Sequence, residues 1–415
     1  MSAVTEAPTS IEPAADLITA TGRSYFPIAL VARLPYAMMV VGVLTLVVSA
    51  RDSMTLAGLN SAMVGVGSAV FGPAIGAAVD RYGQRPVLLA TGTANSLALL
   101  AMSIVVFSPL PDIAVLVVAF AIGATAPQVS PLSRSRLVGI IGHRLPAGRR
   151  ERALNGTMAY ESAADEVIFI VGPALVGLLA TVMEPVAPVI GAAVLTAIFV
   201  GAFALHHTAE GVSHPTVDGG RVMAPARELW RPRLVTVLLG VLGMGLYFGT
   251  TLTGLTAFMD DRGMAPRAGL VYGCMGIGSA VLALGVALFP DGFTRQARWV
   301  SFGAVLLGGT AIFPWVSSVP AMCGALFVAG IGIGPTLVTH YSLGSIRSPF
   351  GRSATVMTML GSAIVVGQSA STAISGLISQ DFGAHVALFL PMGAAALVVA
   401  AGFADWLLVR RHSAG

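Results

Sequence analysis

Long apolar runs recur along almost the whole chain, and this repetition limits the possible folds more than any other feature. Many of the runs reach the roughly 20 residues that an α-helix needs to cross a bilayer. Of the 415 residues, 55% are hydrophobic and 10% are charged, whereas a soluble globular protein carries about 25% charged residues. The runs do not alternate between apolar and polar residues, as the strands of a membrane barrel would. The sequence therefore predicts an all-α membrane protein.

The apolar runs divide into twelve predicted membrane spans joined mostly by short connections, which make neighbouring helices antiparallel. The expected spans are 25–49, 56–79, 86–107, 113–139, 154–181, 186–206, 233–257, 268–289, 298–317, 320–342, 353–378 and 386–409. One long polar connection separates the first six spans from the last six. The expected organisation is a disordered cytoplasmic tail at 1–22, a six-helix bundle at 23–206, a cytoplasmic linker at 207–232 and a second six-helix bundle at 233–411.

The arginines indicate how the chain is oriented in the membrane. All 23 basic residues are arginine, a usage that we interpret as the mark of a GC-rich bacterial genome. With a cytoplasmic N-terminus, only Arg51, Arg262 and Arg267 fall in outer loops, and the other loop and tail arginines lie inside. Positive charge is retained on the cytoplasmic side, so both termini are expected there, with the protein in the cytoplasmic membrane. The arginines are spread over short loops, so no nucleic-acid partner is expected.

The two halves of the sequence resemble each other in several places. The segment "FAIGATAPQ" at 120–128 is similar to "FVAGIGIGP" at 327–335, and "RALNGTMAYESAA" at 152–164 aligns with "RSATVMTMLGSAI" at 352–364. The separation stays near 200 residues in both cases. A constant order and separation indicate a duplicated six-helix unit, which is an architecture of many transporters. We therefore expect two pseudo-symmetric six-helix bundles.

A compact charged motif, "GAAVDRYGQRP" at 76–86, lies between the second and third predicted spans. It resembles the loop signature of the major facilitator superfamily, roughly Gly-x-x-x-Asp-Arg-x-Gly-Arg-Arg. The matching positions are Gly76, Asp80, Arg81, Gly83 and Arg85, and Gln84 replaces one basic residue of the signature. The resemblance implies the twelve-span fold of that superfamily and a bacterial, efflux-like transporter.

The resemblance also implies a role for Asp80. In the superfamily this loop faces the cytoplasmic start of the eleventh span, here near Arg352 and Ser353, and closes a cytoplasmic gate. From the residues alone, Asp80 at a helix end can accept from Arg81 or Arg85 or face the positive start of another helix. The alternative is that the motif serves only as a charged topology anchor. We favour the gate, because a carboxylate does not contribute to positive-inside orientation.

A second superfamily likeness lies in the fifth span, at "FIVGPALVG" (169–177). Gly172 and Pro173 match the antiporter motif of the superfamily, but Val176 stands where that motif has a glycine. The likeness is therefore partial, and it implies export rather than proving it.

Ionisable residues inside the predicted spans are functional candidates, since a charge at the centre of the bilayer costs about 2.5–3.5 kcal/mol on insertion scales. They are the acids Glu161, Asp165 and Glu166, and the arginines Arg33, Arg134 and Arg136. Counting 1.5 Å per residue places them at similar depths. We expect Arg134 to pair with Glu161 or Asp165. One interpretation is a proton-coupling site, in which movement of an arginine changes the proton affinity of an acid; the other is a fixed ionic cluster.

Further polar residues are expected to line a central cavity, namely Gln128, Tyr247, His340, Tyr341 and Gln368. His340 could instead be a hydrogen-bonded packing residue. Asp405 is expected to pair with Arg410 or Arg411 near the membrane interface. Gly334 and Pro335 are the expected hinge of the tenth span.

Together these patterns predict a secondary active transporter that works by alternating access. Without any lysine, the chain cannot form a phosphate-binding loop, so energy is expected from an ion gradient, with protons favoured. The predicted activity is efflux of a small amphipathic molecule; the alternatives are a metabolite uptake carrier and a transport-dead sensor. A membrane-embedded enzyme is disfavoured, because His-Glu-x-x-His and Gly-x-Ser-x-Gly motifs are lacking. The expected partners are substrate, protons and membrane lipid, with no cofactor or metal, for a monomeric protein.

Overall fold

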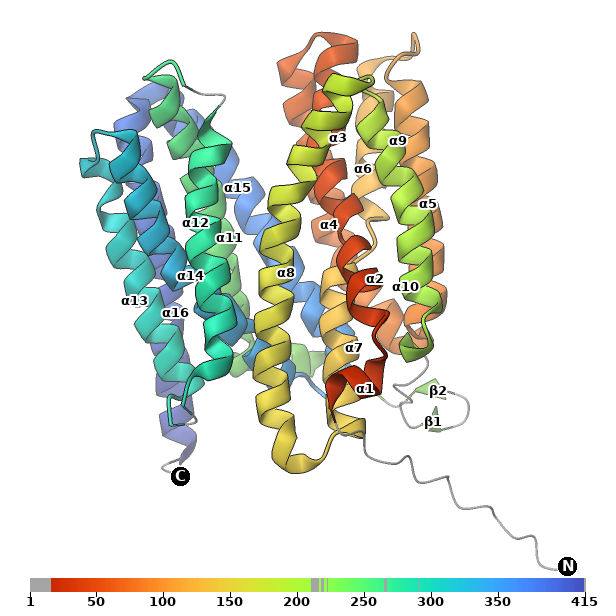
Figure 1. The fold of residues 1–415 in the computed structure, drawn as a ribbon, viewed down its shortest axis with the longest axis vertical. Helices are drawn as coiled ribbons and strands as arrows, with labels where there is room; N and C mark the ends of the chain where they lie inside the picture. Colours follow the sequence, from red (N-terminus) through yellow and green to blue (C-terminus); the bar gives the residue numbers. More distant parts are fainter. Residues whose placement is uncertain are drawn as a thin grey trace, which may run out of the picture.

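The computed structural model describes residues 16–209, 216–217, 220–221, 223–264, 267–290 and 292–413. Among these, twelve helical segments are long and apolar enough to cross a membrane, as the sequence predicts. They form two bundles of six that stand side by side (Figure 1). The first described helix, α1 (Leu17–Thr21), and the end of the last one, α16 (Leu390–Ser413), lie at the same end of the molecule (Figure 1).

The helices of the first bundle begin near Tyr25 and end at Leu205. They are α2 (Tyr25–Val31), α3 (Leu34–Arg51), α4 (Met54–Tyr82), α5 (Gln84–Val105), α6 (Asp112–Ala124), α7 (Val129–Arg144), α8 (Ala147–Val182), α9 (Ala187–Leu195), the π-helical turn η1 (Thr196–Val200) and α10 (Gly201–Leu205).

The second bundle follows the linker. It consists of α11 (Pro232–Asp260), α12 (Ala268–Gly285), the short turn η5 (Val286–Leu288), α13 (Arg295–Ala311), η6 (Phe313–Trp315), α14 (Val319–Arg347), α15 (Ser353–Ala387) and α16 (Leu390–Ser413).

Short elements lie outside the bundles. They are α1 (Leu17–Thr21), η2 (His207–Ala209), β1 (Thr216–Val217), β2 (Gly220–Arg221) and η3 (Ala226–Trp230). The two strands pair antiparallel, with Thr216 opposite Arg221.

The expected disordered tail at 1–22 is partly wrong. Asp16 caps α1 by accepting from the backbone N–H of Thr19 at 2.7 Å, as aspartate does at helix starts. Ala20 of α1 packs in a small apolar cluster with Ile140 and Ile141 of α7. Residues 1–15 lie outside the described residues.

Two spans that the sequence analysis treats as continuous are broken in the middle. The first span changes direction at Ala32 and Arg33, two residues before Pro35, and the fourth breaks at 125–128, around Pro127. Proline has no backbone N–H, and it disfavours helical geometry at the preceding residue. The breaks place Arg33 at the junction of α2 and α3 and start α7 immediately before Ser130 and Arg134, which form part of the site described below.

Two boundaries also differ from expectation. The fifth span begins at Ala147, rather than at 154, and the eleventh continues to Ala387, rather than ending at 378. Gly383 breaks the helical geometry of α15 with a φ of +83°, a left-handed value that glycine adopts readily. The residues up to Ala387 are therefore two helical segments that meet at a kink at Gly383.

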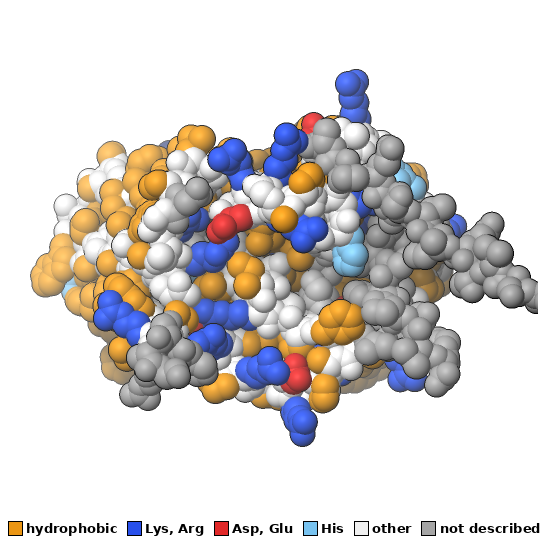
Figure 2. Space-filling view, turned by 90° about the horizontal axis from the view of Figure 1, so that it is seen from below, with side chains coloured by type: hydrophobic (Ala, Val, Ile, Leu, Met, Phe, Trp, Pro, Cys, Tyr) orange, Lys and Arg blue, Asp and Glu red, His pale blue; other side chains and the backbone are white. Residues whose placement is uncertain are grey.

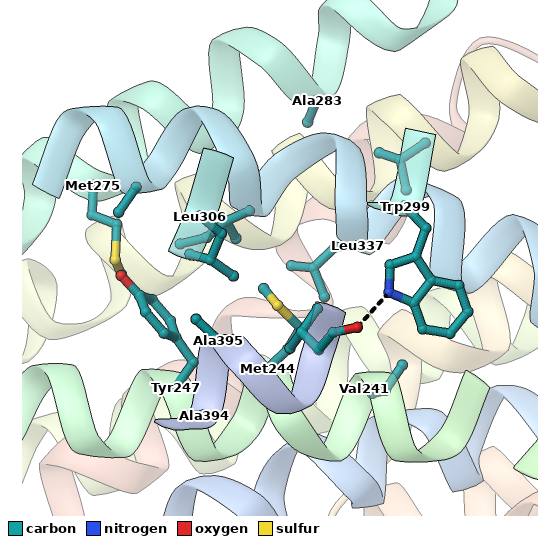
Figure 3. Close-up of a cluster of buried hydrophobic side chains, with 14 of the residues drawn as sticks. Val241, Met244, Tyr247, Met275, Ala283, Trp299, Leu306, Leu337, Ala394 and Ala395 are labelled. Atoms are coloured by element: carbon teal, nitrogen blue, oxygen red, sulfur yellow. Dashed lines mark hydrogen bonds between the residues drawn. The ribbon is translucent and has the colours of Figure 1, made fainter. Parts of the chain in front are cut away.

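The interior of the second bundle contains two residues that are expected in a central cavity. Tyr247 is completely buried beside Met275, and its hydroxyl oxygen accepts from Thr310 Oγ1 at 3.3 Å (Figure 3). His340 is completely buried against the ring of Trp299, with ring centroids 4.4 Å apart. Both expectations are therefore corrected, because these side chains point into their own bundle. Sequence periodicity alone does not distinguish that direction from the face towards the other bundle.

The end of the molecule that holds both termini also carries most of the arginines, and we call it the basic face. It comprises the chain ends and the loops after α4, α7, η5 and α14. Figure 2 shows arginine side chains distributed over this face, with few acidic ones. This distribution agrees with the arginine pattern of the sequence.

Glycines allow the helices of the second bundle to approach closely. A Cβ at Gly330 of α14 would overlap the carbonyl oxygen of Met275 on α12, whereas a Cβ at Gly324 of the same helix would meet nothing within 4 Å. Such close contacts between backbones are typical of membrane helix pairs. The expected hinge residue Gly334 makes a similar contact, with the carbonyl oxygen of Ser279, inside a continuous helix.

We expect Gly330→Val to destabilise the fold and Gly324→Val to leave it almost unchanged. Overpacking a tight contact costs about 1–3 kcal/mol. The atom that the new side chain would meet belongs to the backbone of α12, so it cannot move aside as the end of a flexible side chain could. Thermal unfolding of both variants in the same detergent measures the difference. Equal melting temperatures would contradict the packing of α14 against α12.

Candidate functional site

The carboxylate of Asp80 lies at the contact between the two bundles, near the basic face. It is 3% exposed and caps the start of α15 in the second bundle. Oδ1 accepts from the backbone N–H of Ala354 at 3.0 Å, and Oδ2 accepts from the N–H and the hydroxyl of Thr355 at 2.8 and 2.6 Å. The first N–H groups of a helix lack intrahelical partners and carry partial positive charge. The helix start, one of the partners considered for Asp80, is thus confirmed as a contact.

The helices α4 and α15 are closest at the basic face and diverge from it. An added Cβ would overlap the Thr358 hydroxyl at Gly76 and the Ser362 hydroxyl at Gly72. At Gly65 it would lie 3.0 Å from Ser369 Oγ, and at Gly58 nothing lies within 4 Å. The bundles are therefore joined at the basic face, and these two helices separate towards the opposite end.

The remaining residues of the charged motif shape its turn. Gly83 has a φ of +94°, which accounts for a glycine between α4 and α5. Arg81 is exposed and lies over the ring of Tyr82. Gln84, the departure from the family signature, donates to the carbonyl of Leu132 on α7 at 3.1 Å. Arg85 lies at the start of α5 on the basic face.

Arg136 does not join the acids, contrary to expectation. Its Nε donates to Gln84 Oε1 at 2.8 Å, and its NH1 donates to the carbonyl of Phe203 at 2.9 Å and to Thr208 Oγ1 at 3.2 Å. The guanidinium also lies 3.9 Å from the centre of the Phe203 ring. Two residues along a helix correspond to a turn of about 200°, so Arg136 and Arg134 face different neighbours.

Two arginines and two acids form a buried ion cluster inside the first bundle. Arg33 donates to Glu161 Oε2 at 2.6 Å and to Asp165 Oδ1 at 3.1 Å, and Arg134 donates to Asp165 Oδ2 at 2.8 Å. The pair Arg134–Asp165 is thus confirmed as a contact, and Glu161 takes Arg33 as its partner. Glu161 and Asp165 are four residues apart, so they share one face of α8. The four charges cancel.

Hydroxyl groups complete the coordination of the acids. Ser130 donates to both oxygens of Asp165, at 2.9 and 2.7 Å, and also accepts from Arg134. Ser133 donates to Glu161 Oε1 at 2.9 Å, and the Tyr25 hydroxyl lies 2.9 Å from Ser133 Oγ. Sequence reasoning did not identify the hydroxyl groups of Ser130, Ser133 and Tyr25 as part of the site. Ser130 and Ser133 lie within four residues of Arg134 on α7, and this closeness in the sequence could have identified the two serines as part of the site.

The cluster contacts the second bundle at Arg134. Glu161 is completely buried, whereas the side chain of Asp165 is 23% exposed. The ring of Tyr341, on α14, covers Arg134 with its centre 4.0 Å from the guanidinium carbon. A cation over an aromatic ring is attracted to its face. Tyr341 is therefore at the contact between the bundles, unlike its neighbour His340.

Glu166 lies apart from this ion cluster, contrary to the expected grouping of three acids with three arginines. Its Oε1 accepts from Ser279 Oγ on α12 at 2.7 Å. Among the residues that the structure describes, no arginine forms an ion pair with Glu166. It therefore links α8 of one bundle to α12 of the other.

The other candidate residues occupy varied positions. Gln128 is buried at the break before α7 and donates to the carbonyl of Ala126 at 3.1 Å. Gln368 on α15 is partly buried. Gly172 lets α8 approach α3, because a Cβ there would overlap that of Ala37, and Pro173 follows it inside the helix.

Asp405 has a different partner from the expected one. It is completely buried and pairs with both terminal nitrogens of Arg347 on α14. The hydroxyl of Thr236, on α11, donates to Asp405 at 2.9 Å. Arg410 instead lies over the ring of Trp406. This pair connects three helices within the second bundle. Over the described ranges, no group of three or more histidine, cysteine or acidic residues could hold a metal ion.

Comparison with known proteins places this geometry in a family. The family model of the Major Facilitator Superfamily matches residues 25–372. A search of curated protein sequences finds no significant match.

Solved structures share the fold over nearly the whole chain. The human organic anion transporter MFSD10 (TETRAN) is 16% identical, with a TM-score of 0.71 over 93% of this chain and 99% of that one. A bacterial homologue of the iron transporter ferroportin, in an outward-facing state, is 14% identical, with a TM-score of 0.72 over 94% and 98% of the two chains. At these identities the likeness establishes the fold alone.

We expect Glu161→Gln to destabilise the protein strongly, because it leaves Arg33 buried with one anionic partner fewer. Removing one member of a buried ion pair costs about 3–5 kcal/mol. Glu151→Gln is the matched control on the same helix, since Glu151 forms an exposed pair with Arg295 at 2.9 Å, and exposed pairs contribute about 0–1 kcal/mol. Thermal unfolding of both variants tests this difference. A loss for Glu161→Gln no larger than that for Glu151→Gln would contradict the structural importance of the cluster.

Proposed function

Since the chain belongs to the Major Facilitator Superfamily, we propose that it is a proton-coupled exporter of a small amphipathic molecule. The family and the fold support membrane transport by a secondary transporter. Alternating access requires two bundles that can close at either end around a site between them. The observation that carries the proposal is the position of the buried Asp80 contact, which joins the bundles at one end while α4 and α15 diverge towards the other.

Orientation follows from the basic face. Arginine-rich loops are retained in the cytoplasm, so we place the basic face there, with both termini, in the cytoplasmic membrane of a bacterium. The conformation is then open towards the outside. In this interpretation Asp80 holds the cytoplasmic gate closed, and its contact with α15 is lost when the protein opens inwards.

The ion cluster supports coupling to protons. Asp165 is the partly exposed member, and its charge is balanced by Arg33 and Arg134. A change of conformation that moves Tyr341, on the second bundle, away from Arg134 alters the surroundings of this acid. Because neighbouring charges and solvent both change the proton affinity of a carboxylate, such a movement links proton binding at the carboxyls of α8 to conformation. Glu166, on the same helix, provides a further carboxyl at the contact between the bundles.

The direction and the substrate class are inferred from the fifth span and from the charges of the ion cluster. Gly172 and Pro173 favour export through their likeness to the antiporter motif. The human neighbour is named as an organic anion transporter, but the cluster here balances two arginines with two acids. That balance favours neutral or cationic amphipathic compounds over anions. The alternatives are uptake of a metabolite and a sensor that keeps the fold without transport.

We expect purified protein in proteoliposomes to move amphipathic dyes such as ethidium against a concentration gradient when a pH gradient is imposed. Reversing the pH gradient reverses the net movement of an exporter that exchanges substrate for protons. Empty liposomes with the same gradients are the control. Flux that is independent of the pH gradient would contradict proton coupling, and a lack of flux for every compound of a broad panel would favour the sensor.

We expect Asp80→Asn to slow turnover while substrate binding changes little. An amide accepts the three donors of α15 poorly, and hydrogen bonds to a charged group are worth about 1.5–3 kcal/mol, so turnover should fall roughly 10-fold or more. The matched control is Asp112→Asn, since Asp112 also lies at a helix start but is 63% exposed. Binding of the same compound by equilibrium fluorescence, beside flux, separates the two effects. Equal turnover in the two variants would contradict the gate.

A further inference from the structure

The Glu166 carboxyl differs from the other acids of the membrane interior in the partners that it contacts. Glu161 and Asp165 are held by arginines at 2.6–3.1 Å. Glu166 instead accepts a single hydrogen bond, from the hydroxyl of Ser279, which is 1% exposed. That bond is formed between the two bundles, whereas the bonds of Glu161 and Asp165 stay within one.

The titratable and charged groups around Glu166 are few. Asp165 precedes it on α8, and Tyr272 approaches it from α12, on the stripe that also carries Ser279. From α14, Tyr341 covers Arg134, and Arg33 is held by the other two acids. A carboxylate with one hydroxyl partner and a second carboxylate nearby is costly in apolar surroundings, and a neutral carboxyl costs less there. The Glu166 carboxyl is therefore suited to bind a proton in this conformation.

The position of Glu166 along α8 bears on the path of a proton. Its side chain is partly exposed in the conformation described here. Nearer the basic face, α8 also packs against η5 of the second bundle. The carboxyl thus lies further from the basic face than this contact between the bundles.

Resting on the proposed function, we propose that Glu166 is the carboxyl that carries the proton through the transport cycle. It takes up a proton from water on the open side while Ser279 holds it against α12. When α8 and α12 separate at the basic face, the bond to Ser279 breaks and water surrounds the carboxyl. The proton then passes from the carboxyl oxygen to water on the cytoplasmic side. Ser279 is a positioning residue, and Glu161 and Asp165 stay bound to Arg33 and Arg134.

Chemical labelling tests where the proton resides. Dicyclohexylcarbodiimide reacts with protonated carboxyls in apolar surroundings, and peptide mass spectrometry locates the modified residue. We expect the full chain in liposomes to be labelled at Glu166, with less labelling as the pH rises, and not at Glu161 or Asp165. In Ser279→Ala the pH at which labelling is half-complete should shift. Labelling at Asp165 in place of Glu166, or none at Glu166 at any pH, would overturn the assignment.

Transport variants test whether that proton drives flux. With ethidium as the probe, Glu166→Gln should lose accumulation driven by a pH gradient at least 10-fold yet retain exchange of labelled for unlabelled ethidium without a gradient. Glu166→Asp keeps a carboxyl and should retain part of the driven flux, and the exposed Glu184→Gln should match the wild type. Driven flux in Glu166→Gln equal to that of the wild type would overturn the assignment. Wild-type flux that ignores the pH gradient would instead contradict the proposed function, whatever residue is labelled.

Discussion

A charge between membrane helices must be neutralised by a partner, and this requirement organises the interior of the protein. An uncompensated charge at the bilayer centre costs about 2.5–3.5 kcal/mol on insertion scales. Arg33 and Arg134 are therefore bound by Glu161 and Asp165, and Arg347 is bound by Asp405. These pairs stabilise each bundle internally. Acids at the contact between the bundles are bound by donors of the other bundle, either a helix start or a single hydroxyl, and those groups are the ones that can respond when the bundles move.

Asp80 and Glu166 illustrate the two solutions at the contact between the bundles. Asp80 is stabilised by three donors at the start of α15, so opening the gate exposes both the carboxylate and the unsatisfied helix end. Glu166 has one hydroxyl partner on α12, so opening that contact changes its solvation. The two contacts, α4 with α15 and α8 with α12, are related by the duplication of the six-helix unit. The gate and the proposed proton site thus lie at symmetry-related contacts between the two bundles.

The sequence predicts the twelve spans, the two bundles and a pair of Arg134 with either Glu161 or Asp165, because hydropathy and rise per residue determine depth in the membrane. It does not predict the direction in which a side chain points. Tyr247 and His340 face the interior of their own bundle, Arg136 faces Gln84, and Glu166 faces Ser279. These outcomes depend on the rotation of each helix about its axis and on the breaks at Arg33 and Pro127, which only tertiary packing determines.

The most direct test of alternating access is a distance measurement at both ends of the molecule. With Cys274 and Cys323 replaced by alanine, spin labels at Tyr82 and Phe350 report on the basic face, and labels at Met183 and Leu270 report on the opposite end; all four positions are exposed. Pulsed electron paramagnetic resonance then gives the two distance distributions. We expect Asp80→Asn to lengthen the first distance and shorten the second. Two distances that lengthen together, or that do not respond, would contradict a transporter that opens alternately to the two sides.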